Sequence, residues 1–259
     1  MSACEKGGRW QSALAMLSAM TDMQVTPNVI SCSAAISACG KGGCWQGALA
    51  ILSTMTELQV TPEVVSYNAA IGACAGGGRW QLALDMLGTM TKLRVMPDVI
   101  TCSTAISACE KGCQWMTALA ILWSMTKLHV RPGIISFNAA ISACKKGGQW
   151  QLALAVLSST IQMQFVPDVI TWSAAISACE DDGQWQHALT LLDAMANAQM
   201  TPNVLSCSAA VSACEKGGQW QNALILLGAM PELQVLPNVI SCNSVIRACA
   251  KGGQWPSSS

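Results

Sequence analysis

The sequence predicts an all-α fold, an α-solenoid wound as a right-handed superhelix of stacked helix-turn-helix repeats. Tryptophan recurs every 35 residues, proline and cysteine keep the same spacing, and each unit contains two segments of helical periodicity. The tryptophans are Trp10, Trp45, Trp80, Trp115, Trp150, Trp185, Trp220 and Trp255. The prolines run from Pro27 to Pro237 and the cysteines from Cys4 to Cys249. A helical pair this short cannot bury its apolar faces alone, so successive pairs must stack.

Residues 29–63 show how a repeat divides into two helices. The first helix follows Asn28, whose side chain can accept a hydrogen bond from a free amide of the first turn, and it ends at the Gly42-Gly43 pair. The second helix has apolar residues at i, i+3, i+4, i+7 and i+10, which predicts one buried face. These residues are Trp45, Ala48, Leu49, Leu52 and Met55. Pro62 cannot continue this helix, and it precedes the next cap.

The repeat spacing divides the chain into three parts. Residues 1–28 are a partial repeat, the end of a first helix plus a second helix, and residues 29–238 are six complete repeats. Residues 239–259 are a truncated repeat with a tail that we expect to be disordered. Because the first residues match positions 36–41, we expect the chain to open within a repeat, and no targeting segment is visible.

Composition limits the partners of the chain. Hydrophobic residues make up 52% and charged residues 11%, but Gly, Pro or a charge interrupts every apolar stretch before it could span a bilayer. We therefore expect a soluble protein without a membrane partner. The 14 basic and 14 acidic residues give a net charge of zero, so the overall attraction that most nucleic-acid-binding proteins use is missing. This counts against a nucleic-acid partner but does not exclude one.

The 14 cysteines admit a disulfide, a metal or a packing interpretation. No CxxC pair occurs, and stacked helices lie about 10 Å apart, beyond the limit of roughly 7 Å between the α-carbons of a disulfide. Small, buried, reduced side chains are therefore expected. Cys109 and Cys113 could share a metal with a third ligand, but His129 and His187 are too isolated to complete the site. We predict no metal and no cofactor.

The repeat junctions and second helices carry two further motifs, P-[DN]-V-[IL]-[ST]-x-[NS] and A-L-x-[ML]-L. Together with the period of 35, they resemble the pentatricopeptide repeat family over the whole chain. A tetratricopeptide array, with a period of 34, is the nearest competitor, but seven successive spacings of 35 do not fit it. The resemblance implies that the partner is single-stranded RNA, bound at about one base per repeat. It also implies a mitochondrion or chloroplast as the location.

Two polar positions vary between repeats while their surroundings barely change. The position in the first helix is Ser33, Asn68, Ser103, Asn138, Ser173, Ser208 and Asn243. The position directly after the proline is Asn28, Glu63, Asp98, Gly133, Asp168, Asn203 and Asn238. In the resembled family, the helix residue hydrogen-bonds one base edge and the residue after the proline of the same unit supports it. The apolar residue beside the helix start packs against base faces there; here it is Ile30, Val65, Ile100, Ile135, Ile170, Leu205 and Ile240.

Carried over pair by pair, the resemblance implies the site 5′-N-U-N-U-A-A-3′ for the six complete repeats. The pairs that resemble the uracil-preferring combination are Asn68 with Asp98 and Asn138 with Asp168. The pairs that resemble the adenine-preferring combination are Ser173 with Asn203 and Ser208 with Asn238. Two pairs depart from the common combinations, so their bases are unassigned: Ser33 with Glu63 and Ser103 with Gly133.

Each of these sets also has a purely structural interpretation. Asn or Asp after proline is an ordinary N-cap, and Ser in the first helix could be a small packing residue. Asn residues buried without partners would be costly, which favours a functional role for them. Lysines recur where the first helix ends: Lys6, Lys41, Lys111, Lys146, Lys216 and Lys251. Gly76 and Asp181 stand at the equivalent position in the other two repeats. In the family, basic residues there meet phosphates, whereas a cation is also favourable at any helix C-terminus.

No catalytic constellation is visible in the sequence. Neither histidine has an obvious Ser or Cys nucleophile, no Gly-rich loop follows a strand, and the HxE with PCxxC pattern of zinc deaminases is missing. We therefore predict a non-enzymatic RNA-binding solenoid. One alternative is a protein-interaction scaffold that binds a partner on its concave face, which the low positive charge favours. Another is a fragment or decayed gene product whose exposed end repeats drive self-association.

Overall fold

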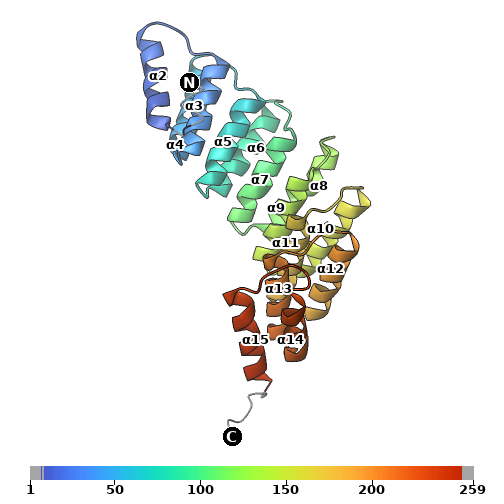
Figure 1. Cartoon of the computed structure of the whole chain (residues 1–259). Helices are drawn as coiled ribbons and strands as arrows, with labels where there is room; N and C mark the ends of the chain where they lie inside the picture. Colours follow the sequence, from blue (N-terminus) through green and yellow to red (C-terminus); the bar gives the residue numbers. More distant parts are fainter. Residues whose placement is uncertain (1–6, 8, 253–259) are drawn as a thin grey trace. The chain divides into compact units, whose positions relative to one another are not determined.

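The computed structural model describes residues 7 and 9–252, which form fourteen α-helices and no strand (Figure 1). The first helix of each repeat, helix A, is α3 (Val29–Lys41), α5 (Val64–Gly76), α7 (Val99–Lys111), α9 (Ile134–Lys146), α11 (Val169–Glu180), α13 (Val204–Lys216) and α15 (Val239–Lys251). The second, helix B, is α2 (Trp10–Asp22), α4 (Trp45–Glu57), α6 (Trp80–Lys92), α8 (Trp115–Lys127), α10 (Trp150–Gln162), α12 (Trp185–Asn197) and α14 (Trp220–Ala229). The expected all-α solenoid of helical pairs is confirmed. Its right-handed winding stays a prediction.

The chain divides into two compact units, residues 1–139 and 140–259. In the first unit α3 packs on α5 and α5 on α7, while α4 lies against both α3 and α5. In the second unit α11, α13 and α15 pack in the same order, and α12 and α14 each contact the helix A before and after them. The helix end expected within residues 1–6, which include Cys4 and Lys6, and the tail expected after residue 252, which includes Trp255, lie outside the described residues.

Local signals determine where the helices begin and end. At α3, the Ser31 amide donates to the Asn28 side chain and the Asn28 amide donates to the Ser31 hydroxyl, both at 2.9 Å. This capping box satisfies two amides that the helix itself leaves without partners. The helix ends at Lys41, and Gly43 adopts a φ of +75°, which glycine tolerates without strain. The expected start after Asn28 and end at Gly42-Gly43 are confirmed.

The core of each repeat combines small residues of helix A with the stripe of helix B. In α3, Ala35, Ala38 and Cys39 are completely buried, which allows neighbouring helices to approach closely. In α4, three residues of the predicted apolar stripe are buried: Ala48, Leu52 and Met55. The other two, Trp45 and Leu49, are half-buried. The amphipathic pattern therefore predicts the buried face of helix B correctly.

The periodic tryptophans join successive repeats. A β-carbon on Gly77, in the turn of the next repeat, would stand 2.5 Å from Cδ1 of Trp45. Three more glycines approach the tryptophan of the preceding repeat in the same way: Gly112 with Trp80, Gly217 with Trp185 and Gly252 with Trp220. The guanidinium of Arg79 also lies 5.0 Å from the centre of the Trp45 ring, a cation–π contact. The shared spacing of Trp and Gly thus reflects a contact between neighbours.

The cysteines serve mainly as small core residues. All thirteen described cysteines are free, and nine of them are buried. Burial raises the pKa of several thiols to about 11, among them Cys74 and Cys144, so they are protonated at neutral pH. Within residues 9–252, no three His, Cys, Asp or Glu side chains are arranged to hold a metal. None of the described helices is long and apolar enough to cross a membrane.

Candidate nucleic-acid interface

Every helix A exposes a large apolar side chain at its second residue. The exposed fraction ranges from 59% at Leu205 to 79% at Ile30. The set consists of the seven residues predicted to pack against bases: Ile30, Val65, Ile100, Ile135, Ile170, Leu205 and Ile240. In α3, by contrast, Ile36 is fully buried six residues further on, so the helix does have a core side for its apolar residues. Aliphatic side chains exposed at the same position of seven helices make these residues candidates for a binding surface.

In three repeats, the helix residue is hydrogen-bonded to the residue that follows the next proline. The amide nitrogen of Asn68 donates to both carboxylate oxygens of Asp98, at 3.2 and 3.3 Å. The other two contacts run from serine Oγ to asparagine Oδ1: Ser173 to Asn203 at 3.4 Å and Ser208 to Asn238 at 3.3 Å. The structure therefore brings together the two positions that the sequence paired. Asn138 belongs to the first compact unit and Asp168 to the second, so this pair stays a prediction.

Asp98 holds Asn68 in one orientation. The Thr101 amide donates to Oδ1 of Asp98 at 2.7 Å, and the Thr101 hydroxyl donates to Oδ1 of Asn68. Burial alone would raise the pKa of Asp98, but the hydrogen bonds from Thr101 and Asn68 together lower it below its ordinary value. Asp98 is therefore a charged carboxylate at neutral pH. It accepts from the side-chain amide of Asn68, and the Thr101 hydroxyl lies within hydrogen-bond distance of a side-chain oxygen of each residue.

The two unassigned repeats have a different partner for their serine. Ser33 Oγ lies 2.8 Å from Ser66 Oγ, and Ser103 Oγ lies 2.7 Å from Ser136 Oγ. Ser66 and Ser136 are the third residues of α5 and α9, where the other repeats use a hydroxyl in a capping box. Glu63 makes no side-chain cap and Gly133 has no side chain, so these two hydroxyls are available for the preceding repeat. This partner was not predicted, although the sequence has a signal for it: an N-cap residue other than Asn, Asp, Ser or Thr, followed by Ser three positions later.

Two grooves in the first unit connect these positions. One groove has a volume of about 510 Å³ and is lined by candidate RNA-contacting residues of three successive repeats. These residues are Ile30, Ser33, Glu63, Val65, Asn68, Asp98 and Ile100. The other, of about 370 Å³, is lined by Ile100, Ser103, Gly133 and Ile135 among others. Among the described residues that line either groove, none is a lysine or arginine, and Glu63 and Asp98 are acidic.

The candidate polar side chains differ in how far a ligand can reach them. The serines of helix A are buried, with exposed fractions of 8% or less: Ser33, Ser103, Ser173 and Ser208. Asn68 and Asn138 are half-buried, and Asn243 is exposed. Ser33 and Ser103 are nevertheless among the residues that line the grooves. The asparagine repeats therefore present the larger polar surface.

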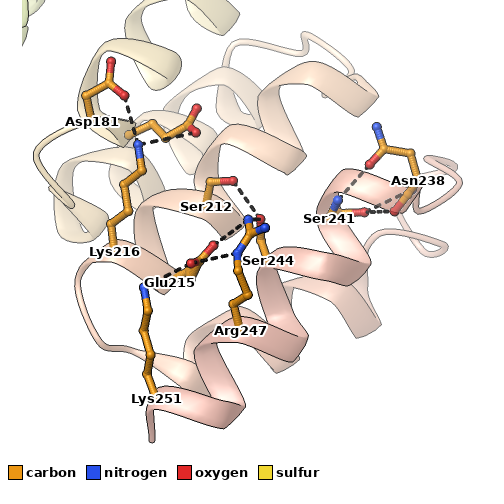
Figure 2. A network of polar contacts seen from close by, with 10 residues as sticks. Asp181, Ser212, Glu215, Lys216, Asn238, Ser241, Ser244, Arg247 and Lys251 are labelled. Carbon is orange, nitrogen blue, oxygen red and sulfur yellow. Dashed lines mark hydrogen bonds and ion pairs between the residues drawn. The ribbon is translucent and has the colours of Figure 1, made fainter.

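Lys216 and Lys251, which were predicted to contact phosphate, are paired with carboxylates (Figure 2). Lys216 Nζ lies 2.9 Å from Asp181 and 3.8 Å from Glu180. Lys251 Nζ lies 3.1 Å from Glu215. Asp181, which interrupts the lysine series in the sequence, thus supplies the partner of the next lysine. Lys41, Lys111 and Lys146 are exposed at the ends of their helices.

Glu215 is the centre of a polar cluster between α13 and α15 (Figure 2). Arg247 donates to its two carboxylate oxygens at 3.0 and 2.9 Å, and also to Ser244 at 3.0 Å. Ser244 in turn shares a hydrogen bond of 3.0 Å with Ser212. Burial alone would raise the pKa of Glu215, which is 6% exposed, but the bonds from Arg247 and Lys251 lower it below its ordinary value. Sequence analysis gave no sign of this cluster, because its charges are 32 and 36 positions apart.

Family models match most of the described chain. The model of the pentatricopeptide repeat domain matches residues 15–79, 121–182 and 190–252. The PPR repeat family model matches residues 62–111, and the PPR repeat model matches residues 170–199. The chain therefore belongs to the pentatricopeptide repeat family. No curated protein matches the sequence.

Solved structures with low sequence identity share the fold. The pentatricopeptide repeat protein PPR10 from maize is 22% identical, with a TM-score of 0.61 over 97% of this chain and 41% of its own. PPR10 in complex with an 18-nt psaJ RNA element is 22% identical, with a TM-score of 0.64 over 98% of this chain and 40% of its own. The PPR domain of Arabidopsis thaliana protein-only RNase P 1 in complex with tRNA is 11% identical, with a TM-score of 0.60 over 70% of this chain and 95% of its own. This chain spans about two fifths of the length of PPR10.

Proposed function

We propose that this chain binds single-stranded RNA along its row of helices A, at about one base per repeat. The observation that carries the proposal is the repeated combination of an exposed aliphatic side chain with a hydrogen-bonded polar pair beside it. The structures of PPR10 with psaJ RNA and of the RNase P domain with tRNA support it, since they have the same fold. By family resemblance, the transcript would belong to a mitochondrion or chloroplast.

The hydrogen bonds within each pair determine which base edge fits. Asn68 gives one amide hydrogen to Asp98, and its second amide hydrogen can be donated to a carbonyl oxygen of uracil. Ser208, which is 7% exposed, gives its only hydrogen to Asn238, which leaves the serine oxygen to accept from the exocyclic amine of adenine. This chemistry agrees with the order 5′-N-U-N-U-A-A-3′ that the resemblance implies.

Binding to synthetic RNA tests the proposal. Fluorescence anisotropy would compare a strand that contains 5′-N-U-N-U-A-A-3′ with one in which A and U are exchanged. The matched strand should bind more tightly at every salt concentration. Equal affinity for the two strands would contradict base recognition. If neither strand bound, the proposal that the ligand is RNA would be wrong.

A second function is favoured by the charge of the grooves. The described residues that line them include Glu63 and Asp98 but no cation, and most of the lining is apolar. Such a surface also fits a basic, apolar segment of another protein, so the chain would then act as an interaction scaffold. A competition experiment distinguishes the two functions. If the chain binds RNA specifically, unlabelled matched RNA should displace labelled RNA better than a basic amphipathic peptide does. If the chain is a scaffold, the peptide should be the stronger competitor.

A further inference from the structure

Two cysteine side chains meet in the turn of the first complete repeat. Cys39 lies in the last turn of α3, and Cys44 is the N-cap of α4. The backbone amide of Cys44 donates to the carbonyl of Cys39 at 2.8 Å, so the chain folds back and brings the two residues together. Their sulfur atoms lie 3.3 and 3.1 Å from the single point where a β-carbon on Gly47 would stand. The two thiols therefore converge on one small space.

This arrangement depends on residues that occur together in one repeat only. At the position of Cys44 the other repeats have Arg9, Arg79, Gln114, Gln149, Gln184 and Gln219. At the position of Gly47 they have larger residues: Ser12, Leu82, Thr117, Leu152, His187 and Asn222. The helix-A cysteine, by contrast, is present throughout. A second thiol and the space to accommodate it therefore appear in the same repeat.

We propose that Cys39 and Cys44 form a disulfide by exchange with a low-molecular-weight disulfide such as glutathione disulfide. The bond would join the end of α3 covalently to the start of α4. A disulfide needs α-carbons roughly 4.4–6.8 Å apart, and the backbone hydrogen bond between the two residues holds them close. The proposal is independent of RNA binding.

The exchange proceeds in two steps that balance. Cys44 is half-buried and within reach of solvent, so its thiolate attacks one sulfur of glutathione disulfide; a mixed disulfide forms and one glutathione leaves as thiolate. Cys39 then loses its proton to solvent and attacks the Cys44 sulfur, which releases the second glutathione. The two cysteines lose two electrons, and one glutathione disulfide becomes two glutathione molecules. In the reduced protein, burial and the neighbouring Cys44 raise the pKa of Cys39 to about 11, so Cys39 is protonated at neutral pH before the exchange begins.

Mass spectrometry of the full chain tests this disulfide. The protein would be equilibrated in glutathione buffers of rising oxidised fraction, quenched in acid, alkylated and digested. In the wild type we expect a peptide that links Cys39 to Cys44, and its loss when reduced glutathione is restored. Cys44→Ser should abolish the link, and Cys39→Ala should leave a mixed disulfide on Cys44. Cys113→Ser, which removes an exposed thiol, should change nothing.

Gly47→Leu is the sharpest control, because it keeps both thiols and introduces the residue that stands at Leu82 and Leu152 in other repeats. Its side chain occupies the space between the sulfurs, so the mixed disulfide should replace the internal link. The proposal is wrong if the wild type carries only glutathione on Cys44 at every redox ratio, or if Gly47→Leu forms the link as readily. Circular dichroism verifies that this variant folds; if it does not, the wild-type result decides alone.

Discussion

At the residue scale, Asp98 combines the two roles that its position in the sequence suggested. It caps α7 through the Thr101 amide, and it also accepts the side-chain amide of Asn68 from the preceding helix A. A cap and the proposed support for a base-recognising residue are therefore compatible in one side chain. Glu63, at the equivalent position, caps nothing and is exposed, so the two residues form a natural comparison.

Asp98→Ala should lower the free energy of unfolding by about 1 kcal/mol, the usual cost of losing an N-cap side chain. Glu63→Ala should change it by much less, because no cap is lost. Because hydrogen bonds lower the pKa of Asp98 in the folded state, its charge stabilises the fold above the unfolded pKa, and this contribution is lost as the pH falls through the folded pKa. Urea unfolding at neutral and acid pH measures both effects. Equal losses for the two variants would contradict the assignment.

Arg247→Ala should raise the pKa of Glu215, because burial then acts on the carboxylate with one fewer hydrogen-bond partner. In the wild type, the folded pKa lies below the unfolded value, so the cluster stabilises the fold at neutral pH and this contribution is lost on acidification. Carboxyl chemical shifts in an NMR titration report the change directly. Lys111→Ala, which changes a lysine of the other compact unit, is the control. An unchanged titration midpoint of Glu215 in Arg247→Ala would show that the Arg247 contacts do not control the charge of Glu215.

At the element scale, the helix bounds could be predicted and the contacts between repeats could not. Asn28, Gly42 and Gly43 are signals that act within a few residues, so they reveal where α3 begins and ends. Trp45 was predicted as part of the buried face of its own repeat, but its indole also lies against Gly77 of the next repeat. A spacing of 35 shows that a contact recurs, without showing which neighbour supplies it.

Gly77→Ala should destabilise the protein by roughly 1–3 kcal/mol, the cost of overfilling a packed site. The φ at Gly77 is −82°, so alanine is allowed there and the contact with Trp45 alone causes the loss. Gly88→Ala, within α6, is the matched control, because the new methyl group would have no neighbour within 4 Å outside the helix's own backbone. That change should stabilise the protein by about 0.5–1 kcal/mol. Thermal or urea unfolding separates the two, and losses of similar size would refute the role of the tryptophan contact.

The candidate site was predictable where it follows a repeated pattern. The contact between Asn68 and Asp98 follows from pairing two periodic positions 30 residues apart. The contact between Ser33 and Ser66 does not follow from such a pairing, because it forms where the Glu63 side chain does not cap α5. Likewise, the lysine series suggested phosphate contacts, whereas Lys216 is held by Asp181, the residue that breaks the series.

At the scale of the whole molecule, charge limits how RNA can be held. The net charge is zero, and Lys216 and Lys251 are paired within the protein. On the proposed function, affinity for RNA should therefore come mainly from contacts with bases rather than from phosphates. This distinguishes the chain from proteins that bind nucleic acid through a general positive field.

The salt dependence of RNA binding should accordingly be shallow. Each phosphate contact to a single strand contributes a slope of roughly −0.7 in a plot of log affinity against log salt. If the exposed lysines Lys41, Lys111 and Lys146 each contact one phosphate, the slope should be about −2. Anisotropy titrations across a series of salt concentrations measure it. A slope of about −4 or steeper would mean that further cations reach the backbone.

The most direct test of recognition repeat by repeat is to exchange one pair for another. The double variant Asn68→Ser with Asp98→Asn gives the second complete repeat the pair found at Ser173 and Asn203, and it keeps an N-cap. Wild type and variant would each be titrated with two RNAs that differ only at the second base. The wild type should prefer U and the variant A, each by about fivefold, the worth of one net hydrogen bond of about 1 kcal/mol. An identical preference in both proteins would contradict the account.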